Sequence, residues 1–325
     1  MSDPLLHHGG NLAAARARFG DGDWLDLSTG INPVPWQIPE DLRPDLGVLP
    51  APDALAALEA AAAAHFGVAP AQLCAVPGSE MGLRLLGMLL GGRACHVVPG
   101  YRTHGAVFAD SMPIAAGEPV PGNATLIFAN PGNPCGTLHS RGDIQALLHS
   151  RTLAGGWLVV DEAFADPHPS ASVAPLVDDR RRLIVFRSFG KFFGLAGLRL
   201  GFVLGPRSVL SRYRRVLGDW PIDTTALAIA TAAYRDGPWI DAVRIALPQR
   251  AAALDGVLVA HGLEPSGRSP LFRLIEHDSA PMMFDRLARA HILVRPFDYA
   301  PRWLRFGIPN GEDALRRLDE ALGNV

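Results

Sequence analysis

The stretch Ser188-Phe189-Gly190-Lys191-Phe192-Phe193-Gly194-Leu195-Ala196-Gly197-Leu198-Arg199-Leu200-Gly201 contains the one lysine of the chain. Of the 30 basic residues, the remaining 29 are arginines, so arginine serves wherever a positive charge only has to face water. Arginine cannot replace lysine as a nucleophile, because a guanidinium stays protonated whereas an amine can lose its proton and condense with an aldehyde. The flanking Phe and Gly residues are also unlike the polar surroundings of a leftover surface lysine. Lys191 is therefore a candidate for covalent chemistry.

The composition is that of a globular protein with room for two cores. The chain has 325 residues, of which 48% are hydrophobic and 19% charged, so we expect two domains. The net charge of -2 gives no electrostatic reason to expect nucleic acid or an anionic membrane as a partner. Cys74, Cys95 and Cys135 lack metal-ligand spacing, so we expect no metal, no disulfide framework and a reduced cytoplasmic location. The first ten residues lack a signal-peptide layout, and no apolar run is long enough to span a membrane.

Short apolar runs alternate with helix-like segments through the middle of the chain. Six of these runs have the length and composition of buried strands: residues 72–76, 94–98, 125–129, 157–160, 183–186 and 200–204. Helix-like segments at 81–90 and 144–149 lie between them, and 51–66 is a strong helix on propensity alone. This alternation predicts an α/β fold with a mostly parallel sheet covered by helices.

The pattern changes after about residue 220. Long helices are expected at 224–234 and 239–261, then strand-like pieces at 271–276, 291–295 and 303–307, and a closing helix at 312–322. We interpret this part as a smaller α+β domain. The expected organisation is an N-terminal arm at 1–33, a large domain at 34–220 and a small C-terminal domain at 221–325.

Polar residues gather where the expected strands end, which is where open parallel sheets bind their ligands. Gly78-Ser79-Glu80 follows the first strand and opens a helix, so it is either an anion site or a plain turn. Asn130-Pro131-Gly132-Asn133-Pro134-Cys135-Gly136 follows the third strand and, in isolation, could be two tight turns. Asp161-Glu162-Ala163-Phe164 ends the fourth strand, and a carboxylate buried there needs a cation or hydrogen-bond donors.

In this order, these stretches resemble the fold-type I pyridoxal 5'-phosphate (PLP) enzymes of the aspartate aminotransferase superfamily over nearly the whole chain. The resemblance implies PLP as the cofactor, with Lys191 as its covalent attachment point. It places Gly78-Ser79-Glu80, Ser188 and Arg199 around the cofactor phosphate. Asp161 would pair with the ring nitrogen and keep it protonated, so that the ring can take up electrons.

Two further side chains are assigned to the cofactor ring by the same resemblance. Asn133 would hydrogen-bond to the ring oxygen. Tyr101, in Pro99-Gly100-Tyr101, fits the aromatic residue that stacks on the ring, although it could also be a half-buried tyrosine at a strand end.

The sequence departs from the family pattern at two positions. Phe164 stands where the family often has a tyrosine that donates a second hydrogen bond to the ring oxygen. Ala54 stands near the position of a tyrosine that often reaches the cofactor phosphate of the partner subunit. We still expect a homodimer, without this contact across subunits.

The N-terminal part carries the more specific resemblance. His8-Gly9-Gly10-Asn11, followed by Leu27-Ser28-Thr29-Gly30-Ile31-Asn32-Pro33, is similar to the arm that closes over the substrate in L-threonine O-3-phosphate decarboxylases of cobalamin biosynthesis. That likeness makes His8, Gly9, Gly10 and Asn32 candidate substrate-binding residues. Taken from the residues alone, His8 could be a tail histidine, and the glycine pair indicates only a close backbone approach.

Two arginines stand at strand-like positions near the C-terminus. Arg305, in Trp303-Leu304-Arg305-Phe306-Gly307, matches the residue that binds the substrate carboxylate across the superfamily. Arg295, in Ile292-Leu293-Val294-Arg295, matches the arginine that binds a distal phosphate. A guanidinium suits both anions, because it binds them bidentately and keeps its charge. Both could instead be salt-bridged strand residues, an interpretation that suits Arg302 or Arg316 better.

The resemblance as a whole implies decarboxylation of L-threonine O-3-phosphate, a small phosphorylated amino acid, to (R)-1-amino-2-propanol O-2-phosphate. Arg305 and Asn32 would hold the carboxylate out of the ring plane, so that this bond breaks and not the Cα–H bond. One alternative is a histidinol-phosphate-type aminotransferase that uses 2-oxoglutarate. A second is a PLP-binding regulatory module without turnover, but such regulators carry a DNA-binding segment, for which we see no room before Asp26.

Overall fold

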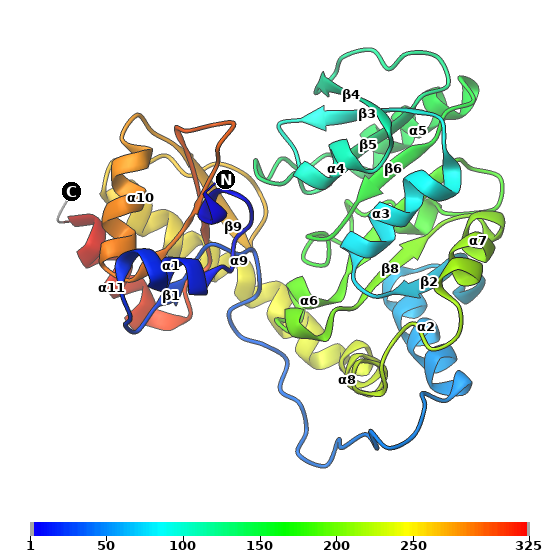
Figure 1. Ribbon diagram of the computed structural model, residues 1–325, viewed down its shortest axis with the longest axis horizontal. Coiled ribbons are helices and arrows are strands. Elements are labelled where there is room, and N and C mark those ends of the chain that lie inside the picture. The colour runs from blue at the N-terminus through cyan, green and yellow to red at the C-terminus, as the bar shows by residue number, and fades with distance from the viewer. Residues whose placement is uncertain (1–2, 324–325) are drawn as a thin grey trace. The chain divides into compact units, whose positions relative to one another are not determined.

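The computed structural model describes residues 3–323 and divides into two compact units (Figure 1). The larger unit comprises Pro35–Asn133 and Thr137–Ala242. The smaller unit comprises the N-terminal residues up to Val34, the short piece Pro134–Gly136, and the chain from Val243 onward. Each unit has its own sheets and its own hydrophobic core.

A seven-stranded sheet forms the centre of the larger unit, in the order β2-β8-β7-β6-β5-β3-β4. Its strands are β2 Leu73–Val76, β3 Arg93–Val98, β4 Asp110–Ala115, β5 Thr125–Ala129, β6 Leu158–Asp161, β7 Leu183–Ser188 and β8 Gly201–Leu204. Strand β8 runs antiparallel to both of its neighbours, whereas the pairs from β7 to β4 are parallel. The predicted α/β fold with a mostly parallel sheet is therefore confirmed.

All six strands expected from the sequence are present, with ends shifted by at most two residues. Strand β4 was not expected. It lies at the edge of the sheet, alternates polar and apolar residues weakly, and contains Pro113. Proline is tolerated at a sheet edge because no neighbouring strand needs its missing N–H. An edge strand is also less buried than the inner strands, so it lacks the continuous apolar run by which they were identified.

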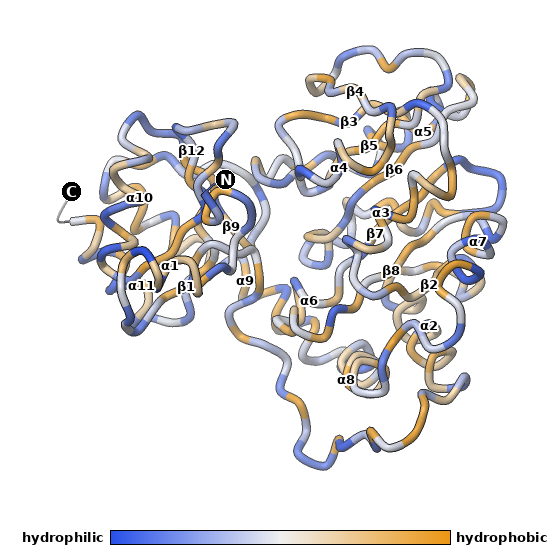
Figure 2. Tube along the Cα trace, viewed as in Figure 1, coloured by the Kyte–Doolittle hydropathy of each residue, from blue (hydrophilic) through white to orange (hydrophobic). Residues whose placement is uncertain are grey.

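Helices cover both faces of this sheet. They are α2 Pro52–Phe66, α3 Ser79–Leu90, α4 Arg102–Ala106, α5 Arg141–Leu153, α6 Phe189–Phe192, α7 Arg207–Leu217 and α8 Thr224–Arg235, with short 3-10 turns at Pro70–Gln72, Ala174–Leu176 and Ala196–Leu198. Side chains from α3 and α7 form one core with Val203 of β8. The preceding residue of that strand, Phe202, points the other way, toward Phe66 of α2 and Tyr234 of α8. The strands are accordingly drawn as largely hydrophobic stretches in Figure 2.

The smaller unit contains a three-stranded antiparallel sheet and a two-stranded parallel one. The first has the order β11-β12-β9, and the second pairs β1 with β10. The elements are the 3-10 turn Pro4–Leu6, α1 Leu12–Phe19, β1 Leu25–Asp26, β9 Phe272–Glu276, α10 Ala280–Arg289, β10 Ile292–Leu293, β11 Arg295–Pro296, β12 Trp303–Gly307 and α11 Gly311–Gly323. Helix α9, Gly237–Ala260, begins in the larger unit and continues into the smaller one. The N-terminal segment thus belongs to the C-terminal core, because Leu5, Ala15 and Leu27 are buried in it.

The division differs from the expected boundary at residue 220. Helix α8 and the first turns of α9 group with the larger unit, because Tyr234 of α8 packs on Phe66 and Trp239 on Phe193. Helical periodicity gave no sign of this, since both helices are apolar on their buried faces whichever unit they join. Within residues 3–323, no helix is both long and apolar enough to cross a membrane.

Candidate active site

The strand register of the larger unit brings the expected site residues to one edge of the sheet. Ser188 is paired with Gly201, and Gly201 with Val76, so the ends of β7 and β2 lie beside the start of β8. Asp161, at the end of β6, is paired with Ala129 and Phe186. Because β8 runs antiparallel, the residues just before it, including Arg199, reach the same edge as the carboxyl ends of its neighbours.

The predicted anion site lies where β2 meets α3. Gly78 caps the helix with φ +84°, and a Cβ there would lie 3.0 Å from a guanidinium nitrogen of Arg199. A Cβ on Gly201 would lie 2.4 Å from the Ser79 nitrogen, so glycine is required for this close approach. The free N–H groups of a helix start with a guanidinium beside them suit a phosphate. The donor set therefore fits the phosphate of PLP, with Ser188 at the neighbouring strand end.

Asp161 is buried and held through both of its carboxylate oxygens. Oδ1 accepts a hydrogen bond from the Ala163 nitrogen at 3.0 Å, and Oδ2 lies 3.0 Å from Nε2 of His104. His104 is buried, and its Nδ1 has no hydrogen-bond partner among the described residues. An anionic Asp161 requires that Nε2 carries the proton and donates it. This arrangement is suited to a carboxylate that pairs with a protonated ring nitrogen.

His104 was missed by the sequence interpretation. It begins no motif, and its one signal is its position three residues after Tyr101, in the short helix α4. The two rings make an edge-to-face contact with centroids 5.6 Å apart.

Tyr101 is anchored by Glu80. Its hydroxyl donates to Glu80 Oε2 at 2.9 Å, while Thr103 and Arg84 donate to Oε1. Burial and the nearby Glu80 charge raise the pKa of Tyr101 well above its usual range, so its hydroxyl stays protonated at neutral pH. Because the Glu80 carboxylate is engaged in this way, any cofactor contact of Glu80 would come from its backbone N–H.

Lys191 lies in the short helix α6, directly after Ser188 and β7. Its Nζ is 5.6 Å from the centre of the Phe164 ring, within the range of a cation–π contact. Phe164 is buried, so the residue that replaces the family's tyrosine packs against the lysine side chain.

Asn133 lies in the loop after β5, and this loop is more ordered than two simple turns. The Asn130 side chain donates to the His139 oxygen at 3.2 Å and accepts from the His139 nitrogen at 2.9 Å. Gly132 donates to the Thr137 oxygen at 2.8 Å. These bonds order the loop that carries Asn133 just beyond the end of β5, which closes at Ala129.

A buried ionic network connects residues of β7 with the segment that follows β6. Arg187, which precedes Ser188, donates to Glu162 and to Asp166 at 2.8 Å each, and His65 contacts Asp166 at 2.8 Å. Burial raises the pKa of Asp166, but Arg187 and His65 outweigh burial and bring it down to about 2. The network ties the residue after Asp161 to the residue before Ser188, so it fixes the two strand ends relative to each other.

In the smaller unit, Arg295 of β11 and Arg305 of β12 are direct cross-strand neighbours, and both are 7% exposed. Arg305 donates to the Ser28 oxygen at 2.9 Å, and Arg295 donates to the oxygens of Leu5 and His7 at 3.0 and 2.7 Å. Like charges directly opposite each other destabilise a sheet. Two such arginines are therefore suited to a ligand with two anionic groups.

The N-terminal candidates are held against the same unit. Gly9 packs on Ser28, whose oxygen would lie 2.2 Å from a Cβ, and the Gly10 nitrogen donates to Ser28 Oγ at 2.7 Å. His8 is exposed and contacts the His7 ring. Asn32 is buried, and its side-chain oxygen accepts from the Val34 nitrogen at 3.1 Å. The close backbone approach expected of the glycine pair is thus made to Ser28.

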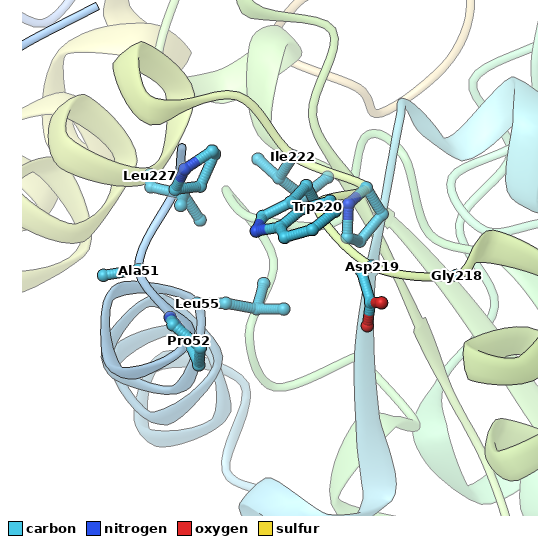
Figure 3. A pocket seen from close by; sticks show the side chains of 10 residues that line it. Ala51, Pro52, Leu55, Gly218, Asp219, Trp220, Ile222 and Leu227 are labelled. Atoms are coloured by element: carbon cyan, nitrogen blue, oxygen red, sulfur yellow. The ribbon is translucent and has the colours of Figure 1, made fainter. Parts of the chain in front are cut away.

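An apolar pocket of about 360 Å³ lies elsewhere in the larger unit (Figure 3). It is lined by residues 50–52, Leu55, 218–222 and Leu227, and Figure 3 shows the side chains of Leu55 and Trp220 among those that surround it. Ala54 lies in the same first turn of α2. The pocket lacks the lysine and the buried carboxylate, so we assign the chemistry to the strand edge. Among the described residues, no three His, Cys, Asp or Glu side chains are grouped to hold a metal ion.

Comparisons with known proteins assign the chain to a family. Residues 106–322 match the model of the family "Aminotransferase class I and II". The chain belongs to this family, whose members use PLP.

Among curated relatives, the threonine-phosphate decarboxylase of Sinorhizobium sp. is 39% identical over 100% of this chain and 99% of its own length. The threonine-phosphate decarboxylase of Pseudomonas aeruginosa is 37% identical over 98% and 97%. By contrast, histidinol-phosphate aminotransferase 1 of Bordetella parapertussis is 36% identical over only 54% of this chain and 50% of its own.

Solved structures show the same fold. The L-threonine-O-3-phosphate decarboxylase of Porphyromonas gingivalis has a TM-score of 0.76 and 17% identity, covering 92% of this chain and 98% of its own. Histidinol-phosphate aminotransferase of Sinorhizobium meliloti, solved with pyridoxal-5'-phosphate, has a TM-score of 0.77 and 19% identity, covering 99% and 96%. At these identities the likeness establishes the fold and leaves the reaction to the sequence relatives and the site.

Proposed function

We propose that this chain is a PLP-dependent carboxy-lyase that converts L-threonine O-3-phosphate to (R)-1-amino-2-propanol O-2-phosphate for cobalamin biosynthesis. The observation that carries the proposal is the buried cross-strand pair Arg295 and Arg305, which suits a substrate with a carboxylate and a phosphate. The full-length likeness to threonine-phosphate decarboxylases supports it.

The residues of the larger unit hold the cofactor in this proposal. Lys191 attaches it covalently, Gly78, Ser79, Ser188 and Arg199 bind its phosphate, and Asp161 binds the ring nitrogen. Asn133 binds the ring oxygen and Tyr101 stacks on the ring. When bound, PLP supplies a ring that accepts electrons from a bond broken at Cα.

The residues of the smaller unit select the bond that breaks. Arg305 and Asn32 bind the substrate carboxylate and fix its orientation, and Arg295 binds the phosphate. Residues 1–33 serve as an arm over the substrate, with His8, Gly9 and Gly10 as its contacts. The carboxylate leaves as carbon dioxide, the electron pair of the broken bond is taken up by the bound cofactor, and the Lys191 ammonium then donates the proton with which that pair forms the new Cα–H bond.

We also propose that the enzyme is a cytoplasmic homodimer. Leu46, Val48 and Leu49 are 76%, 59% and 66% exposed, and Trp220, beside the apolar pocket, is 54% exposed. Leu49 directly precedes Pro50, which lines that pocket together with Trp220, and exposed apolar side chains gathered in one patch are typical of an association surface. Light scattering of the purified protein at micromolar concentration should give twice the mass of the chain, and a monomer would contradict this part of the proposal.

The reaction is tested by offering phosphothreonine, PLP and no keto acid. We expect carbon dioxide and aminopropanol phosphate in equal amounts. The histidinol-phosphate-type aminotransferase alternative predicts no carbon dioxide and an absolute requirement for 2-oxoglutarate.

A further inference from the structure

Ser28 occupies a central position in the smaller unit that no catalytic assignment explains. It is 1% exposed and follows the short strand β1. Its backbone nitrogen and its hydroxyl both donate to Asp26 Oδ1, at 2.9 and 2.6 Å. A hydroxyl has a single hydrogen, so once that hydrogen is directed at Asp26, the Ser28 oxygen is left as an acceptor.

That oriented oxygen receives the N-terminal segment. The Gly10 nitrogen donates to Ser28 Oγ at 2.7 Å. Directly before it, Gly9 packs on the Ser28 carbonyl so closely that a Cβ would lie 2.2 Å from the oxygen. No side chain can be accommodated at that distance without moving the segment.

The same carbonyl also binds Arg305, whose guanidinium donates to it at 2.9 Å. One residue therefore contacts both the glycine pair and the proposed carboxylate-binding arginine. Ser28 cannot shift easily, because the preceding Leu27 donates to the Leu293 oxygen at 2.8 Å and accepts from the Gly307 nitrogen at 2.6 Å.

A second anchor lies just upstream. Arg295, the cross-strand neighbour of Arg305, binds the oxygens of Leu5 and His7. His8 lies between the two anchors, so its backbone is fixed on either side by contacts to one pair of strands.

We propose that Ser28, oriented by Asp26, is a positioning residue that docks the His8–Gly10 segment and holds Arg305 in register with it. It acts through Gly10 and Arg305, to which its hydroxyl oxygen and its carbonyl oxygen are hydrogen-bonded. The inference rests on the proposed function only for its kinetic consequence, because the docking itself exists without substrate. Arm and arginine should therefore act as one preassembled unit when the two substrate anions bind.

Hydrogen exchange of a peptide covering residues 3–11 tests the docking in the PLP-loaded enzyme without substrate. A neutral hydrogen bond contributes about 0.5–1.5 kcal/mol, or roughly two- to tenfold in an opening equilibrium. Ser28→Ala and Asp26→Ala should each speed exchange at residues 8–11 by about that factor. The double variant should speed exchange by less than the product of the two single-variant factors, because both substitutions act through one hydroxyl.

Ser266→Ala is the matched control. Its hydroxyl donates to the Leu274 oxygen in the same unit and, within the described part of the chain, makes no hydrogen bond to Asp26, Ser28 or Gly10. This variant should leave exchange at residues 8–11 unchanged. Unchanged exchange in Ser28→Ala itself would overturn the proposal.

Kinetics give the second readout. Ser28→Ala should raise KM for phosphothreonine about two- to tenfold with a smaller change in kcat, and Ser28→Thr, which keeps the hydroxyl, should recover part of the loss. If Ser28→Ala speeds exchange at residues 8–11 but neither the wild type nor any variant releases carbon dioxide, the docking role is supported and the proposed reaction is wrong. If carbon dioxide release is normal and both exchange and KM are unaffected in Ser28→Ala, the reaction stands and the positioning role fails.

Discussion

Replacing each arginine of the cross-strand pair should affect a different part of the substrate. A hydrogen bond to a charged group contributes about 1.5–3 kcal/mol, which corresponds to roughly tenfold to over a hundredfold in affinity. Arg295→Gln should raise KM for threonine phosphate by about that factor and barely change the reaction of unphosphorylated threonine. Arg305→Gln should impair both substrates, and kcat more than KM, because the bond that breaks is misoriented.

The structure adds a second consequence for Arg295. Its guanidinium bridges the oxygens of Leu5 and His7, and a single ammonium cannot reproduce that fork. Arg295→Lys should therefore keep part of the phosphate affinity but loosen the N-terminal segment. The assay is kcat/KM for both compounds in each variant.

Arg302→Gln is the control for this pair. Arg302 is 57% exposed and ion-paired with Asp278 at 3.1 Å and Glu276 at 3.6 Å, so its loss should change neither substrate. Equal losses for both compounds in Arg295→Gln and Arg305→Gln would refute the division of the substrate between the two arginines.

Three further predictions address the larger unit. Lys191→Ala should abolish turnover while still binding PLP non-covalently. Borohydride reduction of the yellow wild-type enzyme should attach the cofactor to the peptide that contains Lys191, and label on another peptide would contradict this assignment. Asp161→Asn should lower kcat by orders of magnitude while leaving the circular dichroism spectrum unchanged; near-normal turnover in this variant would make the carboxylate structural. His104→Phe should lower kcat about tenfold, and His104→Gln should lower it less, because the glutamine amide can donate the same hydrogen bond to Asp161. Asp166→Asn should lower the free energy of unfolding at pH 7 by about 2 kcal/mol, because the pKa of Asp166 in the folded protein, about 2, lies below its ordinary value. In urea titrations the difference in stability from wild type should shrink as the pH falls from 4 toward 2. A difference that does not depend on pH would contradict this origin.

Much of the larger unit could be predicted because its strands are buried on both faces. Continuous apolar runs end in polar residues there, so strand ends and candidate cofactor residues are visible together in the sequence. The edge strand β4 and the partner of Asp161 were not visible. His104 acts through a contact made only when β6 and α4 come together in the fold, and nothing in its local sequence distinguishes it from a surface histidine.

The strands of the smaller unit were harder to predict from the sequence, because they are short. Its strands are two to five residues long, and residues 291–295 read as one strand although Ile292–Leu293 and Arg295–Pro296 pair with different partners. The sequence indicated that the glycine pair at 9 and 10 approaches something closely, but that Ser28 is the partner depends on a contact 18 residues away.

Carbon dioxide release from L-[1-¹³C]threonine O-3-phosphate, with PLP present and 2-oxoglutarate absent, tests the central claim most directly. We expect labelled carbon dioxide and (R)-1-amino-2-propanol O-2-phosphate in a 1:1 ratio, with no dependence on added keto acid. Turnover that appears only with 2-oxoglutarate, yields glutamate and retains the label in the organic product would contradict it.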